Sequence, residues 1–246
     1  MVGTTVWARW TAWLPASALE PRPGRAGGIA LPMLLSLAFV VTITVVPAAP
    51  VRTAATCAGT TVAPGSLVVG LRDVSRGFTV SSTGCPAPSW TLDWATAHLA
   101  ATSERPAGVV RAGLLHNADA GRSGVTLTLY REDGAAVLTT ATAALRRRTA
   151  WTTPRASAGP AGTTVRARLN RADWDRRAYR GYRGRLVRLL FLPAGSQTFQ
   201  LYGEVRTGAG GALEVTVPTT RPGRWKFEFT GTASSGPSSS PAVTAR

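Results

Sequence analysis

The sequence has few of the residues on which enzymes and metal sites usually depend. Of 246 residues only 2 are histidine and 2 are cysteine, and aspartate and glutamate together number 12. The histidines, His98 and His116, are isolated from each other and from both cysteines, whereas a zinc site needs these ligands clustered. They offer no arrangement with a nucleophile and an orienting group either. We therefore predict no catalytic residue, no metal site and no cofactor.

Acidic residues are also too sparse to form a calcium loop. Asn117 with Asp119, and Asp173 with Asp175, lie two residues apart, so that each pair could share an ion. Calcium takes six or more oxygen ligands, and neither stretch supplies carboxylates at that density. The other carboxylates of the first half fall mainly in turns or on exposed strand faces, where hydration and turn hydrogen bonds explain them.

Lysine is nearly absent, and the chain is nevertheless strongly basic. Lys226 is the only lysine among 28 basic residues, and the net charge is +16. Residues 51–246 alone hold 25 basic and 11 acidic residues, a net charge of +14. A field of that sign attracts polyanions, and the attraction weakens as salt rises. Charge alone does not select the partner, which stays unknown; the candidates are an anionic cell-envelope polymer or a membrane surface, and nucleic acid is disfavoured.

One long hydrophobic run is present, at residues 29–46. It holds no charge, follows an arginine-bearing stretch of the basic lead 1–28, and ends before PAAP and TAAT. This is the order of an export signal. Its 18 residues exceed the usual signal and lie at the low edge of what spans a bilayer. We predict that residues 29–50 are a signal peptide cleaved between Ala49 and Thr56 or a retained membrane anchor, and that the remainder is secreted or displayed at the cell surface.

The two cysteines, Cys57 and Cys85, both follow this segment. An even count in an exported chain favours a disulfide, which by loop entropy would contribute roughly 3–4 kcal/mol. We predict that the bond staples the first domain. Lipid attachment at Cys57 is the alternative, which the preceding Thr56 disfavours.

From residue 60 onward, apolar residues alternate in short runs separated by Gly, Pro, Asn and Asp. This is the period of β-strands, so we predict an all-β chain with two small antiparallel β-sandwich domains after the N-terminal helix. The first domain is expected at 51–145, a linker rich in Arg, Pro, Gly and Thr at 146–162, and the second domain at 163–246. Strands are expected at 66–71, 77–82, 90–99, 108–116, 124–132, 135–145, 163–169, 184–192, 198–207, 212–218, 224–231 and 240–245. Strand parity places Trp90, Leu92, Trp94, Thr96 and His98 on one face.

Five motifs occur in order within residues 163–232. They are the RADW turn (171–174), the YRGYRG segment (179–184), the strand 185–193, the Gly-rich turn 208–211 and Trp225. This pattern resembles the Ig-like module at the C-terminal end of many secreted actinobacterial proteins of unknown function. The resemblance implies an extracellular β-sandwich and no activity, since sandwiches host many functions. The chain departs from the pattern at its end, where SSSPAVTAR stands in place of an acidic, aromatic closing strand.

The segment 171–184 interleaves arginines with aromatic residues. Guanidinium groups match phosphate and carboxylate, and aromatic faces stack on sugars or bases. The candidate binding residues are Arg171, Trp174, Arg176, Arg177, Tyr179, Arg180, Tyr182 and Arg183. In the alternative, which we favour, Trp174 and one tyrosine fold back to cap the sandwich and arginine stems cover them.

We predict a non-catalytic exported cell-envelope or extracellular β-sandwich protein for binding, adhesion or display. The alternative is a module that binds anionic polymers (wall polymer, glycan, lipid or nucleic acid) through segment 171–184 and Arg146–Arg148. A hydrolase of an unrecognised class is the third and least favoured hypothesis.

Overall fold

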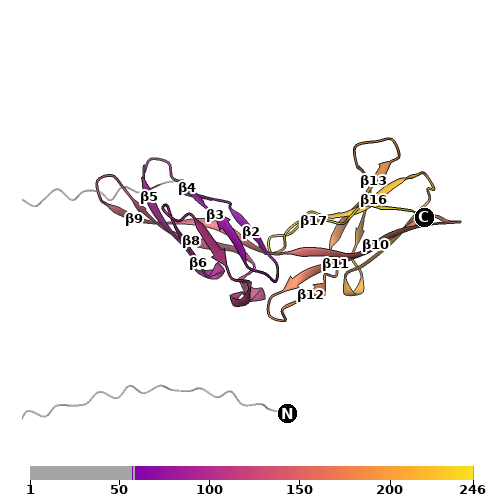
Figure 1. The fold of residues 1–246 in the computed structure, drawn as a ribbon, viewed down its shortest axis with the longest axis horizontal. Coiled ribbons are helices and arrows are strands. Elements are labelled where there is room, and N and C mark those ends of the chain that lie inside the picture. The colour runs from indigo at the N-terminus through magenta and orange to yellow at the C-terminus, as the bar shows by residue number, and fades with distance from the viewer. Residues whose placement is uncertain (1–56, 58, 246) are drawn as a thin grey trace, which may run out of the picture. The chain divides into compact units, whose positions relative to one another are not determined.

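The computed structural model describes Cys57 and residues 59–245 (Figure 1). The basic lead 1–28 and the signal or anchor predicted at 29–50 lie outside these residues. The described residues form strands β1–β18 and four short 3-10 helices, η1–η4. No helix among them is long and apolar enough to cross a membrane. For the residues that the structure describes, the prediction of an all-β fold built from antiparallel β-sandwiches is confirmed.

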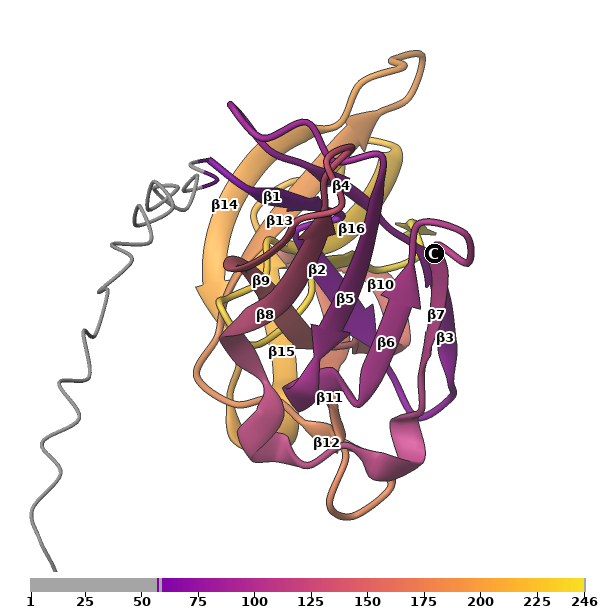
Figure 2. The same ribbon diagram turned by 90° about the vertical axis from the view of Figure 1, so that its left-hand side faces the viewer.

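Strands β1–β9 form what we call the N-terminal sandwich. Its strands are β1 (Thr61–Ala63), β2 (Ser66–Val69), β3 (Val74–Gly77), β4 (Thr79–Ser81), β5 (Ser89–Trp94), β6 (Leu99–Thr102), β7 (Ala107–Val110), β8 (Gly121–Tyr130) and β9 (Ala136–Arg147). One sheet has the order β2-β9-β8-β5-β6, and two ribbons pair β1 with β4 and β3 with β7. Figure 2 shows β8, β5 and β6 in sequence across the sheet, followed by the β7–β3 ribbon. Sheet and ribbons share one hydrophobic core.

Strand β8 shows how alternation builds this core. Val125, Leu127 and Leu129 are fully buried, while the residues between them are more exposed. Each such side chain contributes about 1.5–3 kcal/mol by leaving water. The antiparallel register with β9 runs from Gly121↔Leu145 to Tyr130↔Ala136, and a slip of one residue would turn the apolar set outward. The one parallel pair among the described strands is β2 with β9.

The disulfide between Cys57 and Cys85 is confirmed, with the two Cα atoms 5.2 Å apart. Cys85 is buried, and Cys57 packs against the core of the N-terminal sandwich. The bond therefore joins two positions 28 residues apart and ties the start of this sandwich to its core.

The strand expected at 90–99 is wrong in its second half. β5 ends at Trp94, η1 (Ala95–Ala97) follows, and His98 adopts a left-handed φ of 48°. Leu99 then begins β6 and pairs back on Trp94. Apolar alternation continued through this hairpin because Ala97 and Leu99 are also buried, which concealed the turn. The strand expected at 108–116 likewise ends at Val110, before η2 (Ala112–Leu114).

Strands β10–β18 form the C-terminal sandwich. They are β10 (Thr149–Gly159), β11 (Gly162–Asp173), β12 (Ala178–Gly181), β13 (Leu186–Pro193), β14 (Gln200–Arg206), β15 (Ala212–Val217), β16 (Gly223–Phe229), β17 (Ser238–Ser239) and β18 (Val243–Thr244), with η4 (Ala209–Gly211) before β15. In one sheet β11 pairs with β10, β12 and β15, and in the other β13 lies between β14 and β16. Both sheets contribute to a core in which Phe191 and Trp225 lie 4.3 Å apart between ring centroids. This two-sheet antiparallel arrangement is the one expected of an Ig-like module.

Residues 146–162, which the sequence suggested as a linker, are strand instead. β9 continues to Arg147, β10 begins at Thr149, and β10 forms a long hairpin with β11. The strand pattern is hidden because most of β10 is exposed or half-buried and Pro154 lies where the register shifts between Thr152 and Arg155. A strand tolerates proline at such a bulge.

Candidate functional site at the joint between the sandwiches

The two sandwiches are connected through a single residue, Arg148. Its backbone N–H donates to the carbonyl of Val69 at 2.8 Å, and its carbonyl accepts from the N–H of Ala172 at 2.8 Å. One residue is thus hydrogen-bonded to both sandwiches. The segment from Ala172 to Tyr182 approaches the N-terminal sandwich at this point, and we call the contact region the joint.

Trp174 belongs to the core of the N-terminal sandwich, although it follows β11 of the C-terminal one. Its side chain is fully buried, together with Ala172, among residues of β1–β9. The indole Nε1–H donates to the carbonyl of Gly70 at 2.9 Å, which is 104 residues away in sequence. The structural alternative was therefore correct about burial, but Trp174 fills the neighbouring sandwich rather than capping its own.

Asn117, in η3 (Asn117–Asp119), holds the polar part of the joint. Its Nδ2 donates to Asp173 Oδ1 at 2.8 Å, and its Oδ1 accepts from the backbone N–H of Trp174 at 3.0 Å and from Arg147. The hydrogen bond from Asn117 lowers the pKa of Asp173 to about 2, and hydrogen bonds from Arg176 add to the effect, although burial acts in the opposite direction. The folded joint therefore favours the ionised carboxylate.

The two stretches considered for calcium meet each other across the joint. His116 Nδ1 and Asp175 Oδ1 lie 3.0 Å apart, and the backbone N–H of Asn117 donates to the same oxygen at 3.3 Å. Their oxygens are thus engaged with nitrogen donors. Within residues 59–245 and Cys57, no cluster of three or more His, Cys, Asp or Glu side chains has the arrangement of a metal site.

Three of the predicted binding arginines make contacts inside the protein. Arg176 donates to Asp173 Oδ2 at 3.2 Å. Arg177, at a left-handed φ of 52°, donates to the carbonyls of Ala112 and Gly113. Arg171 donates to Ser235 Oγ at 3.3 Å and lies over the ring of Tyr182 at 4.0 Å.

Tyr182 is buried and is surrounded by cations. In addition to the contact with Arg171, the guanidinium of Arg185 lies 4.5 Å from the centroid of the Tyr182 ring. Burial alone would raise the pKa of the phenol, but the hydrogen bond from Ser235 and the charges of the two arginines lower it overall. Burial, and then the charge of Arg171, lower the pKa of the nearby Arg147. Tyr182 is therefore a structural residue of the C-terminal sandwich.

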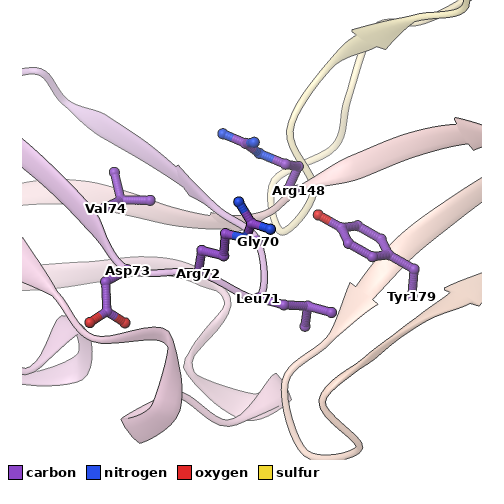
Figure 3. Close-up of a pocket in the computed structure, with 7 residues that line it drawn as sticks. All are labelled: Gly70, Leu71, Arg72, Asp73, Val74, Arg148 and Tyr179. Atoms are coloured by element: carbon purple, nitrogen blue, oxygen red, sulfur yellow. The ribbon is translucent and has the colours of Figure 1, made fainter.

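The other predicted residues, Tyr179, Arg180 and Arg183, are exposed. Tyr179 lines a pocket of about 490 Å³ at the joint (Figure 3). The pocket is lined by Gly70, Leu71, Arg72, Asp73, Val74, Arg148 and Tyr179. Residues 70–74 were not predicted as part of a site, because they form an ordinary connection from β2 into β3 and only the fold brings them to Tyr179. The arrangement offers two guanidinium groups, one phenol and an apolar floor, which can bind an anionic ligand.

No protein-family model matches the chain, and no curated protein matches it in sequence. Solved structures that match include the D00-D0 domain of intimin, with 12% identity and a TM-score of 0.28 over 76% of this chain and 99% of that chain. Murine CEACAM1b matches with 12% identity and a TM-score of 0.29 over 76% and 98%. The three N-terminal domains of the bacteriophage RB49 outer capsid protein Hoc match with 12% identity and a TM-score of 0.28 over 76% and 69%. TM-scores this low decide neither fold nor function.

Proposed function

We propose that this protein is a non-catalytic, exported β-sandwich protein that binds or displays at the cell envelope and holds its two sandwiches together as one binding unit. The observation that carries the proposal is the joint. The segment richest in arginine and aromatic residues, 171–184, is used largely to insert Trp174 into the other sandwich and to satisfy its backbone groups. A joint that fixes the two sandwiches against each other suits the presentation of a rigid binding surface better than it suits catalysis.

Three further features support export. The disulfide Cys57–Cys85 is of a kind that persists in oxidising compartments outside the cytoplasm. The resemblance of residues 163–232 to the Ig-like module of secreted actinobacterial proteins points to the same location. The hydrophobic segment 29–46 would direct the chain there, with cleavage or retention deciding between a secreted and a surface-attached form.

The experiment compares retention of the mature protein, in the form that cells release or retain, on isolated cell-envelope fractions at physiological salt. We expect retention of the native protein and weaker retention of the Trp174→Ala variant, because that change uncouples the sandwiches. Intact mass identifies the cleavage site and the disulfide in the same sample. Absence of retention by any envelope fraction, or turnover of wall or glycan substrates, would contradict the proposal.

Binding of an anionic polymer is a second candidate function, and one observation favours it. Arg72, Arg148, Arg180 and Arg183 are exposed at or next to the joint, and none of them forms an ion pair with any residue that the structure describes. Changing Arg180 and Arg183 to Glu should then reduce retention on polyanions. Unchanged retention would leave presentation as the only function proposed.

A further inference from the structure

The joint pocket brings together cations from two distant parts of the chain. Arg72 follows β2 of the N-terminal sandwich, whereas Arg148 separates β9 from β10. Both line the same pocket, and both side chains are exposed. Two like charges that share a pocket repel each other, and an anion bound between them would relieve this repulsion.

The acidic residue of the pocket does not neutralise them. Asp73 accepts a hydrogen bond from the backbone N–H of Ala112 at 2.9 Å, which ties its carboxylate to η2. Figure 3 shows this carboxylate pointing away from Arg72 and Arg148, while the guanidinium of Arg72 and the ring of Tyr179 point toward one another. Across the described part of the chain, neither arginine forms an ion pair or donates a side-chain hydrogen bond.

Gly70 keeps the pocket open beside Tyr179. A Cβ atom added at Gly70 would lie 2.8 Å from the Tyr179 hydroxyl and 3.3 Å from Cδ of Arg148. The hydroxyl has no hydrogen-bond partner among the residues described, so it is free to bond a ligand. Tyr179 therefore presents an aromatic face and a polar tip toward the guanidinium of Arg72, and the stem of Arg148 lies beside Gly70 (Figure 3).

These features define the chemistry of the ligand. A guanidinium group binds carboxylate or phosphate through paired, charge-assisted hydrogen bonds. Leu71, Val74 and the Tyr179 ring are apolar surfaces that suit the carbon face of a ring. A volume of about 490 Å³ lies within the range of small-ligand sites and accommodates a sugar unit.

We propose that the joint pocket binds one acidic sugar unit of an envelope polymer, with its carboxylate or phosphate between Arg72 and Arg148 and its ring against Tyr179. This inference rests on the proposed binding function and names its ligand class. A chain of such units would meet one pocket on each protein, and the many exposed arginines elsewhere would add attraction without selectivity.

The test is a titration of the mature protein with glucose 6-phosphate, glucuronate, glucose and inorganic phosphate, followed by the NMR shifts of the amides at residues 70–74. We expect both acidic sugars to bind about tenfold more tightly than glucose or inorganic phosphate, because each of those lacks one half of the recognition. Whichever of the two acidic sugars binds more tightly indicates whether the polymer bears phosphate or carboxylate. Equal binding of inorganic phosphate and the acidic sugars would overturn the sugar assignment.

Variants localise the site. Arg72→Gln and Arg148→Gln should each weaken acidic-sugar binding by about tenfold or more, the size expected for a lost charged hydrogen bond. Arg122→Gln and Arg221→Gln remove the same charge from exposed positions away from the pocket and should leave binding unchanged. Gly70→Ala should weaken binding without altering net charge, because the added methyl group displaces Tyr179.

Equal losses in all four glutamine variants would show that only net charge matters and would overturn the pocket. Retention on envelope fractions without any acidic-sugar binding would overturn this inference alone and leave the proposed function standing. Retention on anionic lipid vesicles that competes with envelope binding, with no effect of acidic sugars, would likewise contradict it in favour of a membrane surface.

Discussion

The two sandwiches complete their cores in different ways. The C-terminal sandwich has an aromatic centre of its own, in which Trp225, Phe227 and Phe229 on β16 are buried against β11 and β13. The N-terminal sandwich contains Trp94 but takes a second buried tryptophan, Trp174, from its neighbour. Its ribbons are short, and a disulfide supplements them. The N-terminal sandwich therefore depends on the C-terminal one, and the reverse dependence is weaker.

Replacement of Trp174 should have the largest effect on the difference in stability between the two sandwiches. Trp174→Ala is expected to lower the free energy of unfolding of the N-terminal sandwich by about 3–5 kcal/mol, because it leaves a cavity in a closed core. Hydrogen exchange resolves the two sandwiches, and protection should fall in β8 but much less in β13. Trp225→Ala is the matched control and should reverse the pattern. Equal loss in β8 and β13 after Trp174→Ala would contradict the asymmetry.

Loss of the disulfide should have the second-largest effect on the stability of the N-terminal sandwich. The double variant Cys57→Ser, Cys85→Ser frees a closed loop and is expected to cost the N-terminal sandwich about 3 kcal/mol. The melting temperature of this sandwich should fall while that of the C-terminal sandwich stays the same. A uniform shift of both transitions would show that the sandwiches unfold as one cooperative unit.

Low pH should weaken the joint through Asp173. Because the pKa of Asp173 is lowered from 3.8 to about 2 in the folded protein, the stabilisation is present above pH 4 and is lost as the pH falls toward 2. We expect the native joint to weaken over this range, measured as the urea midpoint of unfolding at successive pH values. Asp173→Asn should be less stable at neutral pH and flatter between pH 4 and 2. The same slope in both proteins would assign the acid sensitivity to other carboxylates.

Asn117→Ala should have a smaller effect, confined to the joint. It removes the partner of Asp173, Arg147 and the Trp174 N–H together, and an unsatisfied buried polar group costs about 1–3 kcal/mol. Exchange protection of the Trp174 amide should fall first. Protection that is unchanged there would mean that water replaces the Asn117 side chain.

The smallest effect is expected on the exposed face of the C-terminal sandwich. Arg166 and Glu214 form a cross-strand ion pair between β11 and β15, and both side chains are largely in water. Arg166→Ala should leave the melting temperature nearly unchanged, because exposed pairs gain little and are screened by salt. A clear loss of stability would show that the sheet surface contributes more than its cores suggest.

Most strands could be predicted from the local sequence, because buried apolar residues alternate with more exposed ones along each strand, as at Val125, Leu127 and Leu129. It did not predict the turn at His98, where buried residues continue on both sides of a hairpin, or β10, where an exposed strand with Pro154 lacks alternation. The site was harder to predict from the sequence than the strands were. Trp174 lies in a segment whose composition also suits ligand binding, and its partners near Gly70 and Asn117 are set only by the tertiary fold. Nothing in the sequence around Arg72 indicates that it lines the same pocket as Arg148.

The position of Trp174 in the chain also affects the order in which the two sandwiches can fold during synthesis. A chain made from its N-terminus produces all the strands of the N-terminal sandwich once β9 ends at Arg147, yet Trp174 is still to be synthesised. Domains that close their own cores fold one after another as they emerge. The N-terminal sandwich cannot fill its core in this way until β10 and β11 have been synthesised, because Trp174 follows them. A ribosome that releases the chain slowly would therefore leave the core of the N-terminal sandwich incomplete until Trp174 has emerged.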